Sequence, residues 1–231
     1  MPFIKKMIYS GNTLEIEKYP VSKKGSRVPR CSKEKLTKES QAALNEKNAK
    51  KNFIRLVETN FKKGDLFITL KYRGEAPDGR KLKRDFQNFF ARLKYHCKKQ
   101  SFAEPVYMGV SHDASSRPHH HIILNKYSWD FIKSLWNYGS VQISELEPDP
   151  EYGFTAIAKY ILNEKNANTF KKRWCAFKNL KKPKVVYKEI KRLSIYKKVE
   201  PPKGYRLINV EITDNVFTGM HQYIRCMKIV A

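Results

Sequence analysis

The order of the apolar patterns between residues 65 and 166 restricts the fold more than any other feature of this sequence. The run KLKRDFQNFFARLKYHCKK (81–99) repeats apolar residues on one side of a helix, at Leu82, Phe86, Phe89, Phe90 and Leu93. Four short β-rich runs are typical of strands, at 65–72, 105–111, 119–125 and 139–146. Two further helices are predicted, at 128–136 and 154–166. This order predicts an α+β protein with a ferredoxin- or RRM-like central antiparallel sheet flanked by helices.

The segments on either side of this core are expected to form extensions. Residues 1–62 are predicted to hold a short strand or arm, then a loop and a Lys-rich helix, or two helices, over about 33–60. Residues 169–231 are strongly basic and end in two β-rich runs around a turn at TDN (213–215). We therefore expect three regions, 1–62, 63–168 and 169–231, the last packing on or extending the core.

The net charge indicates an anionic polymer as partner. The chain has 47 Lys and Arg against 22 Asp and Glu, a net charge of +25, which favours nucleic acid. Residues 165–198 contain 13 cations and one acid, with aromatic residues among them. This pattern is typical of phosphate binding without sequence recognition, and a solvated charged face is the simpler alternative. The candidate DNA-binding residues are Arg117, Lys159, Lys171, Lys172, Arg173, Lys181 and Lys182.

Several classes of protein are disfavoured. The sequence has no apolar run long enough to span a membrane and no signal-peptide pattern, so a cytoplasmic protein is expected. It has no P-loop, so no ATP-driven helicase activity is expected. The four cysteines lie far apart in the sequence, which argues against a CxxC-type zinc site and favours free thiols.

The run RPHHHIILN (117–125) is the strongest candidate for a functional site. Alternate side chains of a strand share a face, so His119 and His121 point one way and His120 the other. Two imidazoles at positions i and i+2 can clamp a divalent ion. His120 is then expected to be a packing residue, on the face that Ile122 shares.

A metal held by two imidazoles usually needs a third ligand. His112 ends the preceding predicted strand, across the hairpin loop, and Asp113 follows it. Strand alternation allows only one of the two to face the site easily, and we favour His112. A histidine at the loop edge that only forms a hydrogen bond is the alternative.

The helix KYILNEK offers a nucleophile. Tyr160 shares a helix face with Asn163 and Glu164, three and four residues on. A phenol with a free pKa of about 10 is a poor nucleophile, but a metal on the target phosphate and nearby cations can make it competent. Considered alone, a tyrosine at such a position as Tyr160 is more often a half-buried aromatic residue between core and solvent than a nucleophile.

These elements, taken in order, resemble the HUH endonuclease superfamily, named for its histidine–hydrophobic–histidine motif. Within it, the chain is similar to the rolling-circle replication-associated proteins of bacterial plasmids and phages. The resemblance covers roughly residues 60–166 by its motif order. It implies a first motif at FITLKY (67–72) and metal ligands at His119 and His121. It places a third ligand, commonly an acid in this family, at or beside His112.

The third family motif is a helix with a tyrosine and a lysine three or four residues on. Tyr160 matches the tyrosine, but those two positions hold Asn163 and Glu164. Either Lys165 reaches round, or Asn163 and Glu164 take over the supporting role. Members with two tyrosines carry the second four residues earlier, which is Ala156 here, so a single-tyrosine enzyme is expected.

The resemblance implies a metal-dependent, sequence-specific nickase and strand transferase in the bacterial cytoplasm. Single-stranded DNA, or an origin hairpin, would bind across the sheet, with Mg²⁺ or Mn²⁺ polarising the scissile phosphate. Attack by Tyr160 would give a 5′-phosphotyrosine link and a free 3′-hydroxyl for the host helicase and polymerase to use in rolling-circle replication. Two alternatives stay open: a single-tyrosine HUH transposase, and a catalytically degenerate RRM-like DNA- or RNA-binding protein.

Overall fold

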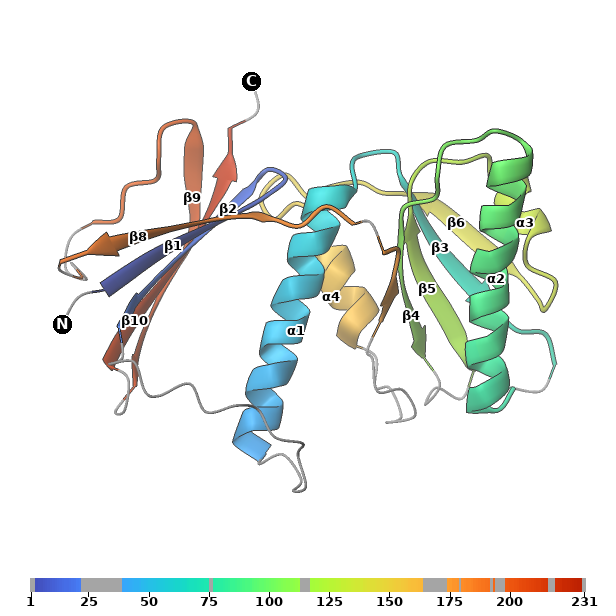
Figure 1. Cartoon of the computed structure of the whole chain (residues 1–231), viewed down its shortest axis with the longest axis horizontal. Helices are drawn as coiled ribbons and strands as arrows, with labels where there is room; N and C mark the ends of the chain where they lie inside the picture. The colour runs from blue at the N-terminus through green and yellow to red at the C-terminus, as the bar shows by residue number, and fades with distance from the viewer. Residues whose placement is uncertain are drawn as a thin grey trace. The chain divides into compact units, whose positions relative to one another are not determined.

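A computed structural model describes residues 3–21, 39–74, 77–112, 117–163, 174–178, 180–191, 193, 198–215 and 219–229. The chain divides into two compact units, each built on its own five-stranded antiparallel sheet (Figure 1). Unit 1 comprises Met1–Thr59, Pro150–Gly153 and Lys182–Ala231, and unit 2 comprises Asn60–Asp149 and Phe154–Lys181. None of the described helices is long and apolar enough to cross a membrane.

Unit 2 contains the α+β core that the sequence predicts. Its sheet has the order β6-β3-β5-β4-β7, and its two-residue strand β7 was not predicted. Helices α2 and α3 lie against one face of this sheet and α4 against the other (Figure 1). The elements are β3 (Leu66–Lys71), α2 (Gly79–Lys99), β4 (Tyr107–His112), β5 (His119–Leu124), α3 (Trp129–Ser134), β6 (Val141–Glu145), α4 (Thr155–Asn163) and β7 (Cys175–Ala176).

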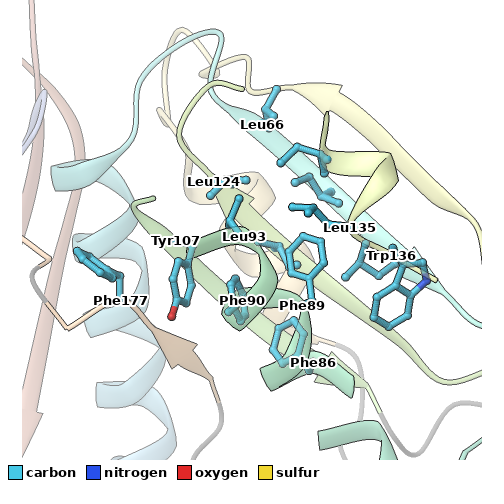
Figure 2. Packing of buried hydrophobic residues seen from close by; sticks show 14 of the residues in the cluster. Leu66, Phe86, Phe89, Phe90, Leu93, Tyr107, Leu124, Leu135, Trp136 and Phe177 are labelled. Carbon is cyan, nitrogen blue, oxygen red and sulfur yellow. The ribbon is translucent and has the colours of Figure 1, made fainter. Parts of the chain in front are cut away.

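The apolar side of α2 forms the core of unit 2. The helix begins after Asp78, whose carboxylate accepts a hydrogen bond from the backbone N–H of Lys81, a standard N-cap interaction. Its buried aromatic residues pack on strands β3, β4 and β5 and on Trp136 (Figure 2). Gly109 of β4 permits this close approach, because a Cβ there would lie 2.5 Å from Cζ of Phe86.

Unit 1 corrects the expectation of a helical N-terminal extension, because the chain begins with two paired strands of a sheet. The helix expected over about 33–60 is present as Glu39–Asn60. FIKKMIYS and TLEIEKYP pair around a tight turn at Gly11, whose φ is +55° and whose Cβ would clash with the carbonyl oxygen of Glu58. The next-to-last strand, Tyr205–Asn215, runs through the expected TDN turn. The sheet order is β8-β1-β2-β10-β9. The elements are β1 (Phe3–Ser10), β2 (Thr13–Pro20), α1 (Glu39–Asn60), β8 (Lys184–Ile190), β9 (Tyr205–Asn215) and β10 (Gly219–Lys228).

A partly buried group of ion pairs links α1 to the sheet of unit 1. Arg55 donates to Glu15 at 2.6 Å and to Glu17 at 2.8 Å, and Lys6 donates to Glu17 at 3.1 Å. Burial alone would raise the pKa of Glu17. The hydrogen bond from Arg55 and the charge of Lys6 outweigh it, so the pKa lies below its usual 4.5.

Candidate metal and nucleic-acid site

The register between β4 and β5 sorts the histidines onto two faces of the sheet. His112 lies directly opposite His119, and residues that are opposite one another in an antiparallel pair share a face. His121, two residues along β5, therefore joins them, whereas His120 points to the other face. The histidine triad, defined as His112, His119 and His121, thus gathers on the face of the sheet against which α4 lies.

The triad forms a candidate metal site. One ring nitrogen from each histidine lies within 4.8 Å of the others, and Nε2 of His119 is 3.2 Å from Nε2 of His121. His112 and His121 are buried, and His119 is partly exposed. Three convergent imidazoles with one open side suit a divalent transition-metal ion that also binds a substrate oxygen.

Hydrogen bonds orient the two β5 histidines of the triad. Nδ1 of His119 lies 3.0 Å from the carbonyl oxygen of Arg117, which can only accept, so Nδ1 carries the proton and Nε2 the lone pair. Nδ1 of His121 lies 3.0 Å from the hydroxyl of Thr69 on β3. Partners of this kind fix the orientation of metal-binding histidines. Burial, and then the charges of His119, His112 and Lys71, lower the pKa of His121 to about 3, which keeps its ring neutral.

His120 occupies the core face and is more than a filler of space. Its ring stacks on Phe86, with centroids 4.3 Å apart. Burial, followed by the neighbouring histidines, lowers its pKa to about 3, so the ring is neutral. The hydroxyl of Tyr72 lies 2.9 Å from Nε2 and that of Ser111 lies 2.8 Å from Nδ1. Both ring nitrogens are therefore satisfied inside the core.

Tyr160 projects from α4 beside the triad. Its side chain is 53% exposed, and its ring centroid lies 5.4 Å from that of His121 and 6.3 Å from that of Phe67 on β3. The phenol ring is thus held by the sheet while the residue remains accessible to a substrate. Lys159, the preceding residue, is also exposed.

The other residues singled out from the sequence are distributed more widely. Arg117 is exposed and adjoins the triad through its carbonyl oxygen. Lys181, in unit 2, and Lys182, in unit 1, are exposed. Asn163 is the last residue of α4. The remaining candidates lie outside the described residues, namely Asp113, Glu164, Lys165, Lys171, Lys172 and Arg173.

Lys71 is a site residue that the sequence analysis missed. It ends β3 directly opposite His119, so its exposed side chain leaves the sheet on the face of the triad. Its charge contributes to the lowered pKa of His121. In FITLKY, Lys71 stands two residues after Thr69, so the two side chains are expected on the same face of the strand. That this face is the one with the triad becomes clear only from the pairing of β3 with β5.

The antiparallel α+β sheet and its histidine triad define unit 2 as a domain of the HUH-like class. Residues 65–165 match the family model described as "Replication-associated protein ORF2/G2P", so this part of the chain is similar to that family of replication-associated proteins. The resemblance inferred from the motifs is thereby confirmed.

Two other comparisons add context. A solved structure, that of the hypothetical protein ORF119 from Sulfolobus islandicus rod-shaped virus 1, is 14% identical, with a TM-score of 0.35. The alignment covers 52% of this chain and 97% of that chain. No curated protein sequence matches the chain.

Proposed function

We propose that the chain is a metal-dependent endonuclease that nicks and rejoins single-stranded DNA to initiate rolling-circle replication. The observation that carries this proposal is the position of Tyr160, exposed and beside the histidine triad on one face of the sheet. The match of residues 65–165 to a replication-associated family supports DNA as the substrate. The net charge of +25 supports a polyanion at this surface.

In the proposed reaction, the hydroxyl oxygen of Tyr160 bonds to phosphorus while the bond from phosphorus to the 3′ oxygen breaks. The phenol proton leaves to solvent, and the departing 3′ oxygen takes up a proton to become a free hydroxyl. The 5′ end remains as a phosphotyrosine ester, whose energy is available for later rejoining. A divalent ion held by His112, His119 and His121 would polarise the phosphate oxygen.

Lys71 supplies the cation that the tyrosine helix lacks at positions 163 and 164. It lies on the same face as the triad, opposite His119, where a phosphate bound at the metal would meet its ammonium group. Arg117 and Lys159 are exposed close to the triad and to Tyr160 respectively, and we assign them to contacts with the phosphate backbone of the strand.

The test is the formation of a covalent adduct. The full chain is incubated with Mn²⁺ and a labelled pool of random-sequence single strands, and the products are separated on a denaturing gel. Wild type should form a protein–DNA adduct that Tyr160→Phe abolishes and that Lys71→Ala slows by about tenfold or more. An adduct that survives in Tyr160→Phe would identify another nucleophile. Binding without any adduct would favour the RRM-like binding protein instead.

A further inference from the structure

The solvent side of α2 carries two groups of cations, near its two ends, that the histidine site does not use. Its exposed cations are Arg80, Lys81, Lys83, Arg84, Lys94, Lys98 and Lys99. The acidic residue of this helix, Asp85, is buried. Together the two groups run from Arg80 to Lys99, about 28 Å along a helix that rises about 1.5 Å per residue.

These charges are not neutralised within the part of the chain that the structure describes. None of the seven side chains has a described carboxylate within ion-pair distance. Asp78, the exposed N-cap residue, directs its carboxylate to the backbone N–H of Lys81. Lys94 lies over the rings of Tyr107 and Phe177, at 5.5 and 5.6 Å. Six cations therefore remain directed to solvent, and they repel one another unless a polyanion lies over them.

We infer that the outer side of α2, defined here as the α2 ridge, is a second DNA-contact surface that binds duplex DNA. It faces away from the triad, because the apolar side of α2 packs on the sheet face that holds His120 (Figure 2). The nicked strand and the duplex would therefore occupy opposite faces of the sheet. The inference takes from the proposed function only that DNA is the polymer.

Duplex is favoured over a single strand by the composition of the ridge. Proteins that hold single strands place exposed aromatic residues among the cations, so that bases can stack on them. Between the two groups of cations the outer side of α2 carries Gln87 and Ala91, and Tyr95 is its exposed aromatic residue. Two groups of cations with a single exposed aromatic residue suit the regular phosphate rows of a duplex, which follow one another every 3.4 Å or so along each strand.

The experiment compares two triple variants of the full chain that lower the net charge equally. The ridge variant is Arg80→Gln, Lys83→Gln and Arg84→Gln. The control replaces exposed lysines of unit 1: Lys47→Gln, Lys203→Gln and Lys228→Gln. Glutamine keeps good helix propensity. Affinity for a fluorescent duplex of arbitrary sequence, and for one of its strands, is measured over a range of salt concentrations.

The ridge variant should bind duplex about tenfold or more weakly than the control, and its log–log salt slope should fall by about 3. The inference would be overturned if the two variants had equal duplex affinity and equal salt slope. It would also be overturned if the ridge variant lost affinity only for the single strand. Covalent adduct formation on a short single strand should be the same in the ridge variant and wild type. A wild type that forms no adduct would contradict the proposed function and leave the duplex comparison intact.

Discussion

At the scale of single residues, the run of three histidines contains two kinds of side chain. His119 and His121 have Nδ1 held by a hydrogen bond and Nε2 directed to the triad, whereas His120 is bonded through both nitrogens in the core. The strand period alone predicted this division. The polar anchoring of His120 was not predicted, because Tyr72 and Ser111 reach it only once β3, β4 and β5 have paired.

The division predicts separate effects on metal binding and on stability. His119→Ala or His121→Ala should weaken Mn²⁺ binding by about tenfold or more, since even changes to supporting partners usually cost that much. His120→Leu should keep the affinity but lower the free energy of unfolding by about 1–3 kcal/mol, because the hydroxyls of Tyr72 and Ser111 lose their partner. Isothermal titration and urea denaturation measure the two effects.

His96→Ala on α2 is the matched control, because this histidine packs among surface aromatic residues far along the helix from Phe86. His96→Ala should change neither the Mn²⁺ affinity nor the free energy of unfolding by much. A folded His120→Leu protein without Mn²⁺ affinity would contradict the division of roles.

At the scale of elements, the distance between α2 and its sheet depends on Gly109. A methyl group there would meet Cζ of Phe86 at 2.5 Å and the carbonyl oxygen of His121 at 3.3 Å. Gly109→Ala should therefore displace the Phe86 ring from His120 and cost about 1–3 kcal/mol in thermal or urea unfolding. Adding Phe86→Leu to this variant should recover part of the loss, whereas the same substitution in wild type should destabilise. If the losses of stability from Gly109→Ala and Phe86→Leu simply add in the double variant, the clash with Phe86 is not the cause of the Gly109→Ala loss.

The elements of unit 2 were predictable because their signals are local. The spacing of Leu82, Phe86 and Phe89 is sufficient for α2, and the hairpin of β4 and β5 brings His112 to His119 across a short loop. Strand β8 was missed. It lies in a lysine-rich run, and its partner β1 is more than 170 residues away in the sequence, so neither composition nor a nearby turn indicates the pairing.

At the scale of the whole molecule, the sequence suggested a core with two extensions, whereas the two ends of the chain combine. Strands β1 and β2 pair with β8 and β10, so N- and C-terminal residues build one sheet in unit 1. Two architectures would give the same local sequence patterns: a central domain with a tail at each end, and a central domain plus a second sheet built from both ends. Only the long-range register separates them.

The ion pairs of unit 1 predict a loss of stability in acid. The pKa of Glu17 is lowered in the folded protein, so its contribution is complete above the usual value of 4.5 and is lost as the pH falls through the folded value. The free energy of unfolding should thus decrease below about pH 4.5, and less steeply in Glu17→Gln. Urea titrations at several pH values check this. Glu211→Gln, an exposed residue of β9, should retain the wild-type pH dependence.

Three identical residues in a row carry no information about which of them belongs at the metal. A strand displaced by one position would still present an imidazole at two of the three places, but it would turn His119 and His121 inward and leave His120 alone on the other face. The register of β5 is therefore set by residues around the histidines. Tyr72 and Ser111 form hydrogen bonds to a ring on the core face, and the apolar residues after His121 in β5 pack in the core. The candidate metal site is thus specified partly by residues that do not belong to the histidine triad.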